Sequence, residues 1–209
     1  MTIKAFALLT LCAAITGCIS LLPEAGPGPD IYRLSDVSAG SDSKHTELVI
    51  LLPLVQAQRE LKNNRLTLVR HDRSIAYAAD ARWAAPTPQM LRKLIADTLT
   101  IRAGIRVVAP ADGVDTAIEL RVGLTSFEAL YDQGAEAAPL AVVRYQVQII
   151  DRKSRTLLAQ ETFRATSRAN DIRLGQVVNA IDLAAHSAAS KLSDWVAQQS
   201  ALRDQGRFK

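Results

Sequence analysis

Residues 143–166 read VRYQVQIIDRKSRTLLAQETFRAT, and this stretch decides the fold. Its first half alternates apolar and polar residues, with the apolar positions at Val143, Tyr145, Val147 and Ile149. Residues 157–166 alternate more loosely in the same way. A period of two is typical of a strand with one buried face. The polar run 151–155 between the two halves fits a hairpin turn, so the stretch predicts two antiparallel strands.

Other strand patterns precede this hairpin. The clearest is at 118–124, where apolar residues again occupy every second position. The run 47–55 is almost entirely apolar and contains Pro53, so it predicts a buried strand with the proline near its end or at a sheet edge. Weaker strand patterns occur at residues 31–34, 66–70 and 105–108.

Two helices are predicted. The first starts near Thr87, a good N-cap residue, with Pro88 at the first helical position, and it stops at Gly104. Residues 74–85 before it are expected to form a loop. The second helix starts after Asn170-Asp171 and carries one apolar stripe, made of Leu174, Val177, Val178, Ile181, Ala185, Ala188, Leu192 and Trp195.

The predicted order of elements is β-β-β-α-β-β-β-β-α, without the βαβα alternation that a parallel doubly wound sheet needs. We therefore predict an α+β fold, a mostly antiparallel sheet with two main helices packed on one face. Apolar residues make up 48% of the chain, which is typical of a folded globular body. Residues 31–200 are expected to form a single domain, followed by a polar C-terminal tail at 201–209.

The N-terminus has the pattern of an export signal. Lys4 precedes an apolar stretch at 5–14, which is too short to span a bilayer and fits the h-region of a signal peptide. Residues 15–18, Ile-Thr-Gly-Cys, resemble the lipobox of bacterial lipoproteins. In that group the cysteine is diacylated, the chain is cut just before it, and the new amino terminus is acylated. The resemblance implies a cleaved signal peptide at 1–17 and lipid attachment at Cys18.

The same resemblance implies a location. Ile19 follows the cysteine, where Asp commonly retains lipoproteins at the inner membrane, so the outer membrane is expected, with the domain on its periplasmic face. Residues 18–30 are rich in proline and glycine and predict an extended tether. The other cysteine, Cys12, lies in the signal peptide, so the mature domain would hold neither a free thiol nor a disulfide.

Recognisable catalytic and cofactor motifs are missing from the sequence. The net charge of +4 comes from scattered basic residues, which argues against nucleic-acid binding. The Gly-x-Gly at 26–28 lies in the tether, and Pro27 removes a backbone donor that a phosphate would need. His45, His71 and His186 do not have metal-ligand spacing. We therefore predict a protein that is not an enzyme and that binds neither a metal nor a cofactor.

Two local features leave alternatives open. His71 and Asp72 could be a base and the carboxylate that orients it, but their polar surroundings favour a solvated loop. Trp83, in the expected loop before the first helix, could pack in the core or anchor a partner protein. We name Trp83 as the candidate partner-binding residue.

With these elements placed, the chain resembles the ABC-type transport auxiliary lipoprotein family, which includes PqiC. The similarity covers roughly residues 30–199. Many members have a tyrosine-rich strand and an acidic residue after this tryptophan, whereas this chain has Ala84 and Ala85 there. The residues that carry the resemblance are Cys18 of the lipobox, the domain start at 31–34, the apolar strand near Pro53, residues 81–86 (Ala-Arg-Trp-Ala-Ala-Pro), the strand pair around Val147 and Phe163, and the final helix.

The resemblance implies a non-catalytic role in a transport system whose other chains are an ATPase, a permease and an MCE (MlaD-like) protein. Such systems move lipids or other hydrophobic molecules between the inner and outer membranes. The chain would be the partner held at the outer membrane by acylated Cys18, and it could form homo-oligomers. Two alternatives are a lipoprotein that binds a lipid or assists assembly alone, and an envelope hydrolase, for which a nucleophile with its base is missing.

Overall fold

The computed structural model describes residues 28–38 and 46–204. The predicted signal peptide, Cys18 and most of the tether lie outside the described residues, as does the end of the predicted tail. The elements are β1 (Asp30–Tyr32), β2 (Val49–Leu51), β3 (Gln56–Ala57), η1 (Arg59–Leu61), β4 (Arg65–Val69), β5 (Ile75–Trp83), α2 (Thr87–Ala103), β6 (Arg106–Val108), η2 (Pro110–Asp112), β7 (Ile118–Leu130), β8 (Leu140–Asp151), β9 (Thr156–Arg168) and α3 (Leu174–Asp204).

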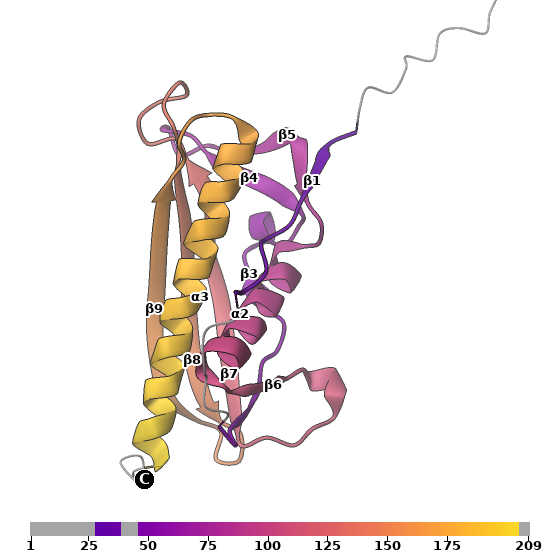
Figure 1. Cartoon of the computed structure of the whole chain (residues 1–209), viewed down its shortest axis with the longest axis vertical. Helices are drawn as coiled ribbons and strands as arrows, with labels where there is room; N and C mark the ends of the chain where they lie inside the picture. Colours follow the sequence, from indigo (N-terminus) through magenta and orange to yellow (C-terminus); the bar gives the residue numbers. More distant parts are fainter. Residues whose placement is uncertain (1–27, 39–45, 205–209) are drawn as a thin grey trace, which may run out of the picture.

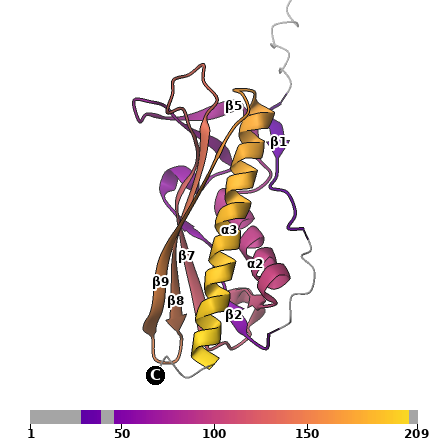
Figure 2. The same ribbon diagram turned by 60° about the vertical axis from the view of Figure 1, so that its left-hand side comes forward.

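The molecule has two layers, a twisted sheet and a pair of helices on one of its faces (Figure 1 and Figure 2). α3 runs along β8 and β9, and α2 packs beside it. This arrangement confirms the predicted α+β fold with two main helices on one face. The long pairings are antiparallel, β7 with β8 and β8 with β9, whereas the short strands add parallel pairings that make the sheet mixed.

The hairpin of β8 and β9 confirms the opening prediction. Val143 faces Ala165 and Tyr145 faces Phe163 across the ladder, and all four residues are buried, so these apolar positions of the two strands fall on the same side of the sheet. The turn at 151–155 is closed by the backbone N–H of Ser154, which donates to Asp151 Oδ1 at 2.8 Å. Arg155 has a φ of 58°, a left-handed conformation that lets the chain reverse here.

β7 is the central strand, and its two edges are covered differently. β8 pairs with one edge along its whole length. The other edge is shared by three short parallel strands, β2 opposite Ile118, β3 opposite Gly123 and β4 opposite Glu128. The apolar run predicted as one strand therefore forms only in part, because Pro53 cannot donate a ladder hydrogen bond and the strand stops at Leu51.

β5 corrects the expectation of a loop at 74–85. This nine-residue strand pairs antiparallel with β4 and parallel with β1. Its alanines, which are poor strand formers, hide the alternation in the sequence. Partners on both sides impose the extended conformation, and the buried residues Ala81 and Trp83 fix which face points to the core.

The helix boundaries agree closely with the sequence. α2 ends before Gly104, whose φ of 65° and N–H bond to Leu99 O make the expected glycine cap. Its N-cap, however, is Pro86, and Thr87 is the first helical residue. The Thr87 hydroxyl donates to Asn63 O at 3.1 Å and so ties the helix start to the loop before β4. α3 continues to Asp204, inside the segment predicted as a polar tail.

The core lies between the sheet and the two helices. α3 presents an alanine seam, defined here as the buried residues Ala180, Ala184, Ala185, Ala188 and Ala189. Such small side chains let the helix approach its neighbours closely, while Ile181 and Leu192 on the same helix supply apolar bulk. Within the part of the chain that the structure describes, neither helix is both long and apolar enough to cross a membrane.

Candidate functional site

The segment that carries the predicted tether enters the described structure at one end of the molecule. β1 lies at this end, and α3 finishes at the opposite end (Figure 1). β1 is held by parallel pairing with β5, in which Tyr32 faces Trp83, and by the N–H of Ala84, which donates to Tyr32 O at 2.7 Å. A pull on the N-terminal segment is therefore transmitted first to β1 and β5.

A second attachment, which we call the clasp, joins Ser35 to Asp182 and His186 of α3. The backbone N–H of Ser35 donates to Asp182 Oδ1 at 2.8 Å, and its hydroxyl donates to Asp182 Oδ2 at 2.6 Å. His186 Nε2 lies 3.0 Å from the hydroxyl and 3.1 Å from the carbonyl oxygen of Ser35. The clasp thus fixes the segment after β1 to the first half of the long helix.

The clasp contains serine, histidine and aspartate, but its geometry is not that of a hydrolase triad. In a triad the serine donates to one histidine nitrogen and the carboxylate binds the other. Here the Ser35 hydroxyl donates to Asp182, and Asp182 Oδ1 is 3.6 Å from Nε2, the same nitrogen that faces the serine. Because the carboxylate binds the nucleophile's own proton, His186 is not oriented as its base. The contacts suit attachment of a chain segment.

His71 and Asp72 lie in the exposed turn between β4 and β5. Asp72 Oδ1 accepts from the backbone N–H of Ser74 at 2.9 Å and from its hydroxyl at 2.6 Å. These hydrogen bonds lower the pKa of the Asp72 carboxyl below its usual value. The carboxylate therefore shapes the turn, which confirms the solvated-loop interpretation. His45 lies outside the described residues.

Trp83 is buried in the core, with 1% of its surface exposed. Its indole lies 5.4 Å from the ring of Phe127, centroid to centroid, at a tilt of 51°. Its Nε1 has no hydrogen-bond partner among the described residues. These contacts correspond to the core-packing interpretation. That Trp83 binds a partner stays a prediction, and the burial of the indole does not support it.

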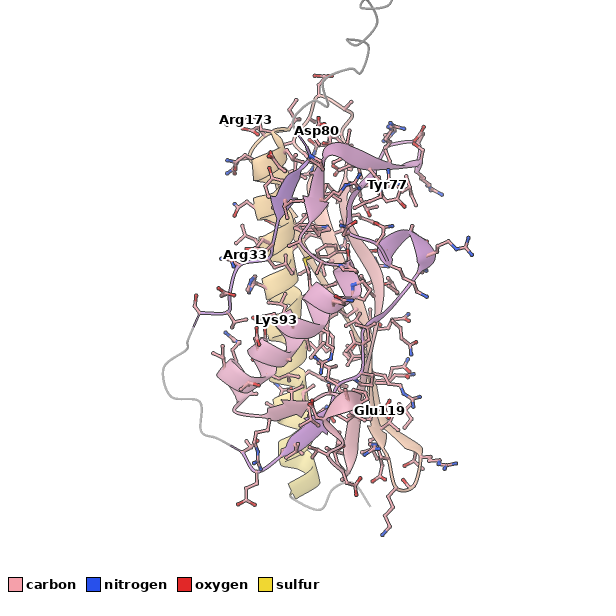
Figure 3. The ribbon with its side chains drawn as sticks, turned by 90° about the vertical axis from the view of Figure 1, so that its right-hand side faces the viewer. Arg33, Tyr77, Asp80, Lys93, Glu119 and Arg173 are labelled. Atoms are coloured by element: carbon pink, nitrogen blue, oxygen red, sulfur yellow. The ribbon has the colours of Figure 1, made fainter. Side chains whose placement is uncertain are left out.

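The remaining acidic and aromatic side chains are dispersed over the molecule. Glu119 lies toward one end of the sheet and Tyr77 toward the other (Figure 3). Glu119 Oε1 accepts from Arg121 at 2.6 Å, and the Tyr77 ring stacks under the guanidinium of Arg65 at 3.7 Å. Among the described residues, no group of three or more His, Cys, Asp or Glu side chains could hold a metal ion.

A cavity of about 830 Å³ opens at the end of the molecule where α3 finishes. Its walls come from both layers, and we call it the distal cavity because it lies at the end opposite β1. Most of the lining residues are apolar, and the polar ones are Thr46, Glu47, Asp115, Thr116 and Gln199. The apolar wall residues are Leu48, Val49, Ile50, Ala103, Ile105, Ala117, Ile118, Ile149, Leu158, Ala159, Val196 and Ala197.

The sequence identified neither the clasp nor the distal cavity. Ser35 and Asp182 are separated by 147 positions, and neither lies in a recognisable motif. The cavity walls come from six strands and helices together with the loops at 46–48 and 115–117, and their apolar residues are indistinguishable by pattern from ordinary core residues. Both features are formed by residues that are distant in the sequence, so they can be recognised only in the folded structure.

Comparison with known proteins gives a consistent result. The family model described as ABC-type transport auxiliary lipoprotein component matches residues 32–193. Among solved structures, the chain is similar to protein XCC0632 from Xanthomonas campestris, with a TM-score of 0.75, 17% identity, and coverage of 84% of this chain and 99% of that chain. A second structure, of an uncharacterized protein, has a TM-score of 0.64 and 16% identity, and covers 81% of this chain and 99% of its own. Among curated protein sequences, none matches significantly.

Proposed function

This chain belongs to the ABC-type transport auxiliary lipoprotein family, and from that membership we propose that it is a non-catalytic component anchored in the outer membrane, which docks an MCE (MlaD-like) assembly during lipid transport. The observation that carries the proposal is the family match over residues 32–193, nearly the whole described domain. Membership already implies a membrane-associated location in the cell envelope. The choice of membrane, the partner and the cargo are the proposed part.

The proposed anchor is Cys18. One acyl chain holds a protein to a membrane only marginally, and each further chain adds about 0.8 kcal/mol per buried methylene. Three chains on the mature N-terminus would therefore be effectively permanent. Ile19 at the next position supports delivery to the outer membrane, because the inner-membrane retention residue Asp is absent there.

The shape of the domain suits a docking protein. The anchored segment enters at the β1 end, and α3 runs away from it over 31 residues, or about 46 Å at 1.5 Å per residue (Figure 1). A partner that contacts the far end would be held that distance from the tether. The clasp and the pairing of β1 with β5 tie the tether to both layers, so the domain would keep its orientation under load.

Two measurements test this proposal. The full-length tagged protein, extracted from cells, should co-purify with an MCE protein, its permease and its ATPase, whereas a tagged, unrelated outer-membrane lipoprotein should not. Membrane fractionation should find the wild-type chain in the outer membrane. Ile19→Asp should move it to the inner membrane, and Ile19→Asn is the matched control of similar size without the charge. Absence of the three partners, together with unchanged envelope permeability on gene deletion, would refute the docking role.

A second candidate function is lipid binding by the domain itself. The specific observation that favours it is the distal cavity, whose apolar walls have no role in the docking proposal.

A further inference from the structure

We propose that the distal cavity binds a single aliphatic chain of a lipid. The site is the space lined by the sheet and by the C-terminal parts of α2 and α3, and the occupant that we assign to it is a fatty acyl chain. This inference rests on the second candidate function, lipid binding by the domain itself, and is independent of the docking role.

The walls are hydrocarbon on both sides. Half-buried apolar residues line the cavity from both layers: Leu48, Val49, Leu158 and Ala159 on the sheet side, and Ala103 and Ala197 on the helix side. The other apolar lining residues include core side chains that are less than a tenth exposed: Ile50, Ile105, Ile118, Ile149 and Val196. Removing apolar surface of this kind from water lowers the free energy of the system.

The polar groups of the walls are already bonded within the protein. The Thr116 hydroxyl donates to Ile118 O and accepts from Arg152 Nη1, both at 3.3 Å. The backbone N–H and the hydroxyl of Thr46 both donate to Gly104 O, at 3.0 and 3.3 Å. An extended peptide needs main-chain partners and a sugar needs hydroxyl partners. A hydrocarbon chain needs neither, and it matches what the walls offer.

The size of the cavity suits a small apolar ligand. A volume of about 830 Å³ lies within the range of roughly 300–1,000 Å³ typical of small-molecule sites. An apolar cavity left unfilled loses dispersion contacts around its lining, and an inserted chain restores them. Two lining residues are charged, Glu47 and Asp115, and the exposed Asp115 pairs with Arg152 at 3.2 Å, so the polar end of a lipid can stay in water beside them.

Photo-crosslinking tests the proposal on the mature lipidated protein in vesicles of phosphatidylethanolamine and phosphatidylglycerol. One arm adds palmitic acid with a diazirine at mid-chain, and the other adds phosphatidylethanolamine that carries the same chain. Labelled peptides should contain Leu48–Ile50 of the loop and β2, or the Val196 region of α3. Labelling by the first probe alone identifies free fatty acid as the source, and labelling by the second identifies a phospholipid.

Two variants fill the cavity from opposite layers. Ala197→Phe on α3 and Ala159→Phe on β9 should each reduce labelling of the cavity peptides at least tenfold. Gln198→Phe is the control, because it places the same ring at the next position of α3, which is exposed. Its cavity peptides should be labelled as strongly as those of the wild type. If one filling variant does not fold, the other and the wild-type peptide map still decide the result.

Three results would overturn the proposal. These are labels confined to exposed apolar residues outside the cavity, such as Leu54 and Ile75, unchanged cavity labelling in both filling variants, or a peptide instead of a lipid released from the protein in native mass spectrometry. Because the protein is assayed without partners, failure of the docking proposal leaves the outcome unaffected.

Discussion

Ser35 and Asp182 are 147 positions apart in the sequence, yet two hydrogen bonds of 2.8 and 2.6 Å join them. One comes from the backbone N–H of Ser35 and the other from its hydroxyl, so a single carboxylate fixes both the main chain and the side chain. Since this segment follows β1, the contact connects the predicted membrane tether to the helix that spans the domain.

Removing the carboxylate should loosen this connection. Hydrogen bonds to a charged group are worth about 1.5–3 kcal/mol, so we expect Asp182→Ala to lower the free energy of unfolding by about 1–3 kcal/mol. It should also speed tryptic cleavage after the exposed Arg33 in the same segment (Figure 3). Asp194→Ala is the control, because Asp194 forms an exposed ion pair with Arg102 at 3.5 Å, and an exposed pair of this kind is worth less than about 1 kcal/mol. Equal cleavage rates in the two variants would contradict the clasp.

Trp83 should matter for stability through its volume and not through its N–H. Trp83→Ala would leave a large hole beside Phe127, and we expect a loss of about 3–5 kcal/mol in denaturant unfolding. Trp83→Phe should cost clearly less, because Nε1 has no partner among the described residues to lose. If the Trp83→Ala variant is instead as stable as the wild type but loses a co-purifying partner, the partner-binding prediction is supported.

The alanine seam should tolerate no larger side chain. Ala185→Leu inserts extra methylene groups at a fully buried position, and such overpacking typically costs 1–3 kcal/mol. Gln198→Leu makes a similar change on the exposed side of the same helix and should alter the melting temperature little. The two melting curves check the prediction, which fails if Ala185→Leu is as stable as the control.

Glu128 should make stability depend on pH. Burial raises the pKa of this half-buried carboxyl, partly opposed by the positive charge of Arg144. A raised folded-state pKa means that the protonated form is favoured in the fold, so its stabilising contribution is present at low pH and is lost as pH rises through that pKa. Glu128→Gln should therefore stabilise the domain at pH 7 relative to the wild type. The difference should shrink as the pH is lowered toward 4, and an unchanged difference across this range would contradict the assignment.

The sequence predicted well wherever the signal is local. Alternation within 143–166 is visible in neighbouring residues, and it predicted the hairpin with its turn. Gly104 ended α2 as expected, because a left-handed residue after a helix is a local requirement. β5 was missed for the opposite reason: its alanines carry little strand preference, and the strand exists because β4 and β1 supply hydrogen bonds on both sides.

By itself, the sequence determined the α+β class, both helices and the long antiparallel strands, since their periodicity follows from which face each residue buries. It also provided the prediction of lipid attachment at Cys18. Only the tertiary structure decided that three short strands share one edge of β7, that Trp83 is buried, that Ser35 binds Asp182, and that apolar residues from both layers surround the distal cavity. These features depend on pairings between distant segments, and such pairings leave no period in the chain.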